Sequence, residues 1–83
     1  DGLIGQYVQA IQMDQAGHIW FGTKSGVSVL TTDSTWVNYT LQDGLISNNV
    51  RDIAFDRDGS AWFATDKGIS KFDYSVWHNY SAF

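Results

Sequence analysis

The fold is decided by the stretch Asp14-Gln-Ala-Gly-His-Ile-Trp-Phe-Gly-Thr-Lys-Ser-Gly26, which returns further along the chain as Asp56-Arg-Asp-Gly-Ser-Ala-Trp-Phe-Ala-Thr-Asp-Lys-Gly68. An aspartate followed three residues later by glycine is typical of a tight turn, because glycine adopts positive φ angles without strain. The run after each turn is apolar on both faces, which predicts a strand buried on both sides. The predicted turn residues are Asp14, Gly17, Gly26, Asp56, Gly59 and Gly68. The predicted core or interface residues are Trp20, Phe21, Trp62 and Phe63.

The repetition extends over the whole chain. Residues 43–46 repeat residues 1–4, and the matches continue to a late Trp-x-Asn-Tyr sequence that begins at Trp36 and again at Trp77. Each repeat holds four short runs rich in β-branched and aromatic residues, with no proline and no helical periodicity. The first four predicted strands are residues 7–13, 18–23, 27–31 and 35–41. We therefore divide the chain into two units, residues 1–42 and 43–83, and add Trp36 and Trp77 to the predicted core or interface.

The length of the repeat predicts the fold class. A period of 41 or 42 residues with four strands is the length of one β-propeller blade. We therefore predict an all-β chain of two four-stranded antiparallel blades. A truncation at Trp62 is expected to cost about 3–5 kcal/mol, as for other large core residues.

Two blades are expected to be an incomplete structure. They leave two large apolar faces in water, and repeats of this kind need three or more neighbours to bury their faces. We therefore expect the chain to bind copies of itself head to tail until a propeller ring closes. Because each chain supplies two blades, a tetramer with eight blades is favoured over a trimer with six.

The composition narrows the possible functions. The chain has no cysteine and only two histidines, so we expect no disulfide, no metal site and no cofactor. Its net charge of −4 predicts neither a nucleic acid nor an anionic membrane as partner. No apolar run approaches the ~18 residues that a membrane-spanning helix needs. The chain begins without Met, and we expect it to be a processed, excised or engineered segment.

No set of residues predicts catalysis. Asp56 and Asp58 resemble the start of a calcium loop but lack its distal glutamate, so a plain turn is the preferred interpretation. His18 and His78 occupy unmatched positions in the two repeats, and a structural role is preferred to that of a ligand or general base. The nucleophile elbow, the P-loop and the His-Glu-x-x-His sequence are all missing. We therefore predict that the chain is not an enzyme.

A polar ligand is the remaining candidate. We expect residues 3–7 and 45–49 to share one face of the propeller with the turns at residues 24–25 and 66–67, around the mouth of the channel. A propeller ring would repeat their polar side chains about its axis and so offer several contacts at once. The preferred alternative is that these side chains solvate the channel and satisfy the loop backbone. The candidate ligand-binding residues are Asn48, Asn49, Arg51, Asp52 and Lys67.

The matching positions also resemble a known family. The string Asp56-x-x-Gly59-x-x-Trp62-x-x-Thr65-x-x-Gly68-Ile69, with Gly44-Leu45, Asn49-Val50 and Ile53 before it, resembles the two-component regulator propeller repeat. The resemblance implies an extracytoplasmic propeller of a bacterial sensor kinase, many of which are linked to carbohydrate sensing. It thus implies a periplasmic or extracellular location and a glycan ligand. Two functions stay open: a self-assembling structural module, which we favour, and a ligand-sensing module.

Overall fold

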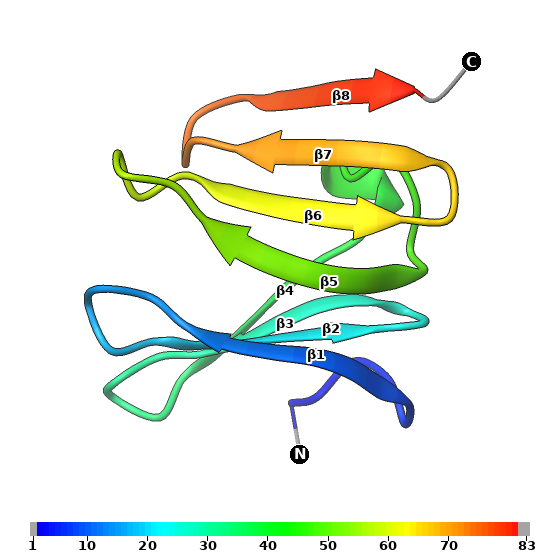
Figure 1. Ribbon diagram of the computed structural model, residues 1–83. Coiled ribbons are helices and arrows are strands. Elements are labelled where there is room, and N and C mark those ends of the chain that lie inside the picture. The colour runs from blue at the N-terminus through cyan, green and yellow to red at the C-terminus, as the bar shows by residue number, and fades with distance from the viewer. Residues whose placement is uncertain (1, 82–83) are drawn as a thin grey trace.

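The computed structural model describes residues 2–81 and contains two four-stranded antiparallel sheets packed against each other (Figure 1). In both sheets the strands are paired in the order of the sequence, β1-β2-β3-β4 and β5-β6-β7-β8. We name the first sheet blade 1 and the second blade 2. The prediction of two four-stranded antiparallel sheets is confirmed. The outermost residues of the two predicted units, residue 1 and residues 82–83, lie outside the described residues.

The strands begin and end close to the predicted positions. Blade 1 consists of β1 (Val8–Met13), β2 (Ile19–Thr23), β3 (Gly26–Leu30) and β4 (Trp36–Tyr39). Blade 2 consists of β5 (Val50–Phe55), β6 (Ala61–Thr65), β7 (Gly68–Phe72) and β8 (Trp77–Ser81). The two sheets approach each other most closely where β5 faces β1 and β2.

The predicted extension of the fourth strand to Leu41 is wrong. The chain leaves the sheet after Tyr39 and forms a short 3-10 turn, η1 (Leu41–Asp43). Thr40 caps this turn: its hydroxyl accepts the backbone N–H of the second residue beyond it, and its own N–H donates to the Asp43 carboxylate at 2.8 Å. This reciprocal cap competes successfully with continued strand pairing. No helix within residues 2–81 is long and apolar enough to cross a membrane.

The repeated aspartates build the β1–β2 and β5–β6 turns in the same way. Asp14 accepts hydrogen bonds from the backbone N–H groups two and four residues later, at 3.0 and 2.9 Å, and from the indole N–H of Trp20 at 2.9 Å. Asp56 makes the same three contacts, the last with Trp62, at 2.9, 3.0 and 2.8 Å. The Trp62 bond is the main reason that the pKa of Asp56 lies below its ordinary value. The repeated string therefore fixes both a turn and the orientation of the following tryptophan.

The core lies between the two blades. Successive residues of a strand point to opposite faces, so Trp20 points toward blade 2 while Phe21 points away, and Phe63 points toward blade 1 while Trp62 points away. Trp20 is 2 % exposed, and its ring centroid lies 5.9 Å from that of Phe63. Trp62 is only half-buried. Within a single chain we therefore expect the cost of truncating a core tryptophan at Trp20 rather than at Trp62. The other buried apolar residues are Val27, Val29, Leu45, Val50, Ile53, Ala61 and Phe72.

Candidate functional site

Each blade has one outward face with large apolar side chains. We call these surfaces the open faces. The register of the strands places Ile11, Phe21, Leu30 and Trp36 on the open face of blade 1. It places Trp62, Ala64, Ile69, Lys71 and Tyr80 on the open face of blade 2.

The open face of blade 2 has the same aromatic pair as the inner face of blade 1. Inside the core, Trp20 stacks on Tyr39 with ring centroids 6.0 Å apart and planes 12° apart. One repeat later, Trp62 stacks on Tyr80 at 6.2 Å and 14°. The second pair faces solvent. This open face therefore reproduces the half of the core that blade 1 contributes.

The open face of blade 1 reproduces the other half. Inside the core, Phe63 lies 5.8 Å from Trp77 with planes 33° apart. On the open face, Phe21 lies 5.7 Å from Trp36 with planes 36° apart. The same residue types in the same geometry are thus half of an interior in one blade and a surface in the other.

Branched aliphatic side chains show the difference in burial most clearly. Ile53 and Val27 lie inside the core and are 1 % and 0 % exposed. Their repeat equivalents, Ile11 and Ile69, lie on the open faces and are 60 % and 43 % exposed. Contiguous apolar residues exposed in this way mark an interaction surface.

The open face of blade 2 is more polar than its counterpart in the core. Lys71 stands where the first repeat has Val29, and its ammonium lies 5.2 Å from the centre of the Trp62 ring. Such a cation–π contact can persist when another apolar surface packs over the aromatic ring. A hollow of about 150 Å³ on this face is lined by residues that include Trp62, Ala64 and Ile69.

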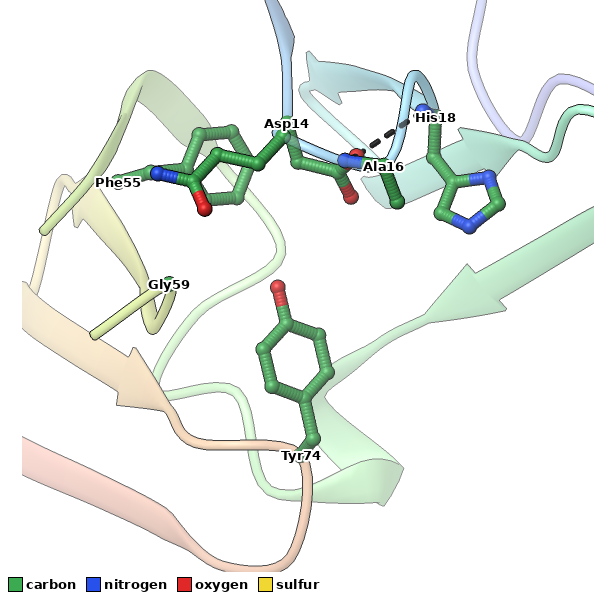
Figure 2. A pocket seen from close by; sticks show the side chains of 7 residues that line it. Asp14, Ala16, His18, Phe55, Gly59 and Tyr74 are labelled. Carbon is green, nitrogen blue, oxygen red and sulfur yellow. Dashed lines mark hydrogen bonds between the residues drawn. The ribbon is translucent and has the colours of Figure 1, made fainter. Parts of the chain in front are cut away.

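A second site, a pocket of about 290 Å³, lies beside the turns of the two blades (Figure 2). Figure 2 shows the Tyr74 ring rising from the β7–β8 turn, with its hydroxyl directed toward the segment that carries Asp14 and Ala16. Burial is the main cause that raises the pKa of Tyr74, and the negative charge of Asp14 adds to it. The lining residues are Asp14, Gln15, Ala16, His18, Phe55, Gly59 and Tyr74.

This pocket was not predicted from the sequence. Its distinguishing residue, Tyr74, stands where the first repeat has only Thr32 and Asp33, so the repeat pattern contains no sign of it. The Asp14 carboxylate already accepts hydrogen bonds from two backbone N–H groups that follow it and from the Trp20 indole of β2. The pocket is therefore an apolar hollow rather than a set of convergent catalytic groups.

Three of the predicted ligand-binding residues have structural partners. The side-chain oxygen of Asn48 accepts a hydrogen bond of 2.7 Å from the first backbone N–H of η1. The side-chain oxygen of Asn49 accepts one of 2.9 Å from Gln9 of β1. Asp52 accepts one of 2.9 Å from the backbone N–H of Ile53. These contacts favour the alternative that such side chains satisfy the local structure.

The other two predicted ligand-binding residues are exposed on the loop face of blade 2. Arg51 and Lys67 lie near Asp66, whose pKa is lowered mainly by a hydrogen bond from Ser47 and further by these two positive charges. The Ser47 hydroxyl and the Asp66 carboxylate are 2.5 Å apart. The loop before the first strand and the turn between the second and third strands therefore share one face, as expected. In blade 1 the same region forms a shallow hollow of about 560 Å³ lined by residues 3–7 and Ser25.

The two histidines contact residues of the β3–β4 and β7–β8 turns. His18 accepts the backbone N–H of Thr32 at 3.1 Å through Nδ1. His78 lies 3.3 Å from the Asp73 carboxylate through Nε2. Within residues 2–81 no three His, Cys, Asp or Glu side chains are grouped to hold a metal ion.

Two stacked four-stranded antiparallel sheets with repeated turns and repeated open faces define this chain as a pair of β-propeller blades. It belongs to the two component regulator propeller family, whose model matches residues 2–25 and 44–67, one match in each blade.

Solved structures agree with this assignment. Over 96 % of its length the chain resembles the extracellular domain of a protein assigned to the hybrid two component systems of B. thetaiotaomicron, with a TM-score of 0.80 and 26 % identity. Over 98 % of its length it resembles virginiamycin B lyase from Staphylococcus aureus, with a TM-score of 0.73 and 19 % identity, which shows likeness of fold alone. The chain covers 12 % and 29 % of these two proteins. No curated protein sequence matches the chain.

Proposed function

We propose that this chain is a structural module, natural or engineered, that closes a β-propeller ring with copies of itself. The observation that carries the proposal is that the two open faces repeat the two halves of the core between the blades. A surface that repeats one half of an interface is complementary to the other half. The open face of blade 2 therefore fits the open face of blade 1 in a second copy, and this head-to-tail contact ends when the ring closes.

The energetics favour such packing. Fully burying one isoleucine side chain contributes roughly 1.5–3 kcal/mol, and each new contact would gain part of this for Ile11 of one copy and for Ile69 of the other, which are 60 % and 43 % exposed in the single chain. The aromatic pairs on both faces add further apolar area. Lys71 can keep its ammonium at the edge of the contact while its alkyl chain is covered. A closed ring leaves no open face in water.

The mass of the native protein tests this proposal. Size exclusion with light scattering should give about four times the 9.3 kDa of one chain for an eight-bladed ring. A mass three times that of the chain would indicate a six-bladed ring and would support the same mode of assembly. A mass of 9.3 kDa at micromolar concentration would contradict it.

A ligand-sensing role is the second candidate. It is supported by membership of the two component regulator propeller family and by the hollow on the loop face, lined by residues 3–7 and Ser25. Exposed polar groups that recur around a ring can bind a glycan through several weak contacts.

A glycan array followed by calorimetry tests the sensing role. If the role holds, the wild-type protein binds at least one glycan, and Lys67→Ala weakens binding without changing the mass of the assembly. The mass control matters because it separates a lost ligand contact from a lost subunit contact. An assembled protein that binds no glycan on the array would exclude carbohydrate sensing by this face.

A further inference from the structure

A polar clasp joins the two blades beside their aromatic core. The side-chain N–H of Gln9 donates to the backbone carbonyl of Val50 at 2.8 Å and to the side-chain oxygen of Asn49 at 2.9 Å. Gln9 lies where the register between β1 and β2 shifts, between Val8 and Ala10. A bulge of this kind changes the direction in which a strand residue points. The bulge of blade 1 thus directs Gln9 onto the first strand of blade 2.

Blade 2 has the same bulge, with Arg51 in place of Gln9. The register between β5 and β6 shifts between Val50 and Asp52, one repeat after the shift in blade 1. Arg51 is exposed in the single chain and has five N–H donors. Because Gln9 of the equivalent bulge points from blade 1 toward blade 2, we expect the bulge of blade 2 to point Arg51 away from blade 1, toward the position that the next blade of a ring would occupy.

We propose that Arg51 clasps the first strand of a second copy of this chain. The residues equivalent to Asn49 and Val50 in that copy are Tyr7 and Val8. The Arg51 guanidinium donates to the Val8 carbonyl, as Gln9 does to Val50, and lies against the Tyr7 ring. This contact rests on the proposed ring assembly and names the residue that fixes the register between copies.

The chemistry of the target strand fits an arginine. The exposed Tyr7 ring already has the Lys24 ammonium 5.2 Å from its centre, so its π face accepts a cation. A planar guanidinium can stack on the remaining face and still donate to a carbonyl, which a lysine ammonium does less well. Tyr7 presents an aromatic ring where Asn49 presents an amide oxygen to Gln9, and the change from glutamine to arginine matches this change of partner.

A complex with a single contact between copies tests the clasp. Ile11→Glu blocks the open face of blade 1 and Ile69→Glu blocks that of blade 2, so the two variants mixed together can pair in one way only. In this pair the Ile11→Glu chain presents Arg51, and the Ile69→Glu chain presents Tyr7 and Val8. Adding Arg51→Ala to the Ile11→Glu chain should raise the dissociation constant roughly tenfold, as expected for losing a hydrogen bond to a charged group.

The same substitution in the other chain is the matched control. Arg51→Ala in the Ile69→Glu chain should leave the dissociation constant unchanged, because that Arg51 faces solvent in the pair. Arg51→Gln in the Ile11→Glu chain should weaken binding less than Arg51→Ala, since Gln9 makes the carbonyl contact in blade 1, but it should lose the contact with the Tyr7 ring. Tyr7→Ala in the Ile69→Glu chain should raise the dissociation constant more when the Ile11→Glu chain keeps Arg51 than when it carries Arg51→Ala.

The possible results separate the clasp from the ring. If the pair forms and Arg51→Ala has no effect in either chain, the clasp is wrong and the ring assembly stands. An equal loss in both chains would show an effect on the fold of each chain, which also overturns the clasp. If the two variants fail to pair while each remains folded by circular dichroism, both proposals fall.

Discussion

A chain that carries Ile11→Glu and a second chain that carries Ile69→Glu should each be monomeric alone. When the two are mixed, they should form a one-to-one complex. Each substitution places a carboxylate within one open face. In a contact between copies that carboxylate would be buried without a partner, which is strongly unfavourable. Mixing restores one contact, between the intact open face of blade 2 in the first chain and the intact open face of blade 1 in the second.

The substitutions should spare the fold of each chain. Ile11 and Ile69 are 60 % and 43 % exposed, so the new carboxylates stay hydrated in a monomer. Circular dichroism melts of the separate variants check this point. Light scattering of each variant and of the mixture then measures association. Ser75→Glu, an exposed turn residue outside the strands of both open faces, adds the same charge and should leave the wild-type mass unchanged.

The mixture also determines which faces meet. If each open face bound its own kind, every single variant would still dimerise through its intact face, and mixing would produce no new species. That result would contradict the head-to-tail contact. A heterologous contact is the expected one because the core pairs unlike faces: Trp20 of blade 1 packs on Phe63 of blade 2.

The sequence predicts the strands well because the signals for them are local. The aspartate–glycine turns and the doubly apolar runs have the same form in both repeats, and they produce the same hydrogen bonds around Asp14 and Asp56. The end of β4 was missed because the cap formed by Thr40 and Asp43 is a contact between side chain and backbone that strand periodicity does not reveal. The local sequence pattern therefore predicts the strands of both blades but not every residue at which they end.

The exposure of each aromatic residue could not be predicted in the same way. Trp20 and Trp62 have nearly identical surroundings in the sequence, yet one is buried and the other half-exposed. The difference arises because only one side of each blade has a neighbour within the chain. The polar residues near the predicted channel show a related limit, since Asn48 and Asn49 accept hydrogen bonds within the chain that composition does not distinguish from ligand contacts.

One substitution between the repeats bears on the size of the ring. A Cβ atom at Gly22 would lie 2.8 Å from the Val50 side chain, so glycine permits the close approach of β2 to the start of β5. The second repeat has Ala64 at this position, which would face Val8 of the next copy. In the proposed ring, the contact between copies would then be slightly wider than the core beside the first strand of each blade. If the first strands line the channel of the proposed ring, wider spacing there reduces the angle between blades, so we expect the eight-bladed ring rather than the six-bladed one.

Trp20→Ala should lower the free energy of unfolding by roughly 3–5 kcal/mol, as for other large core truncations. Trp20 is almost fully buried and lies within 5.5–6.2 Å, centroid to centroid, of Tyr39, Phe55, Phe63 and Tyr74. Removing the indole also leaves Asp14 without one of its three donors. Urea unfolding followed by circular dichroism measures the loss, and Trp20→Phe, which keeps an aromatic ring, should lose less if the alanine variant is too unstable to study.

Trp62→Ala is the informative comparison, because it removes the same side chain from an open face. In a monomer held apart by Ile69→Glu, we expect Trp62→Ala to cost clearly less than Trp20→Ala, since the Trp62 ring is only half-buried there. In the assembled protein its cost should rise toward that of Trp20, because the next copy then covers the ring as blade 2 covers Trp20. Equal costs at the two tryptophans in the monomer would contradict the placement of Trp62 outside the core. A cost at Trp62 that does not change with assembly would contradict its burial between copies.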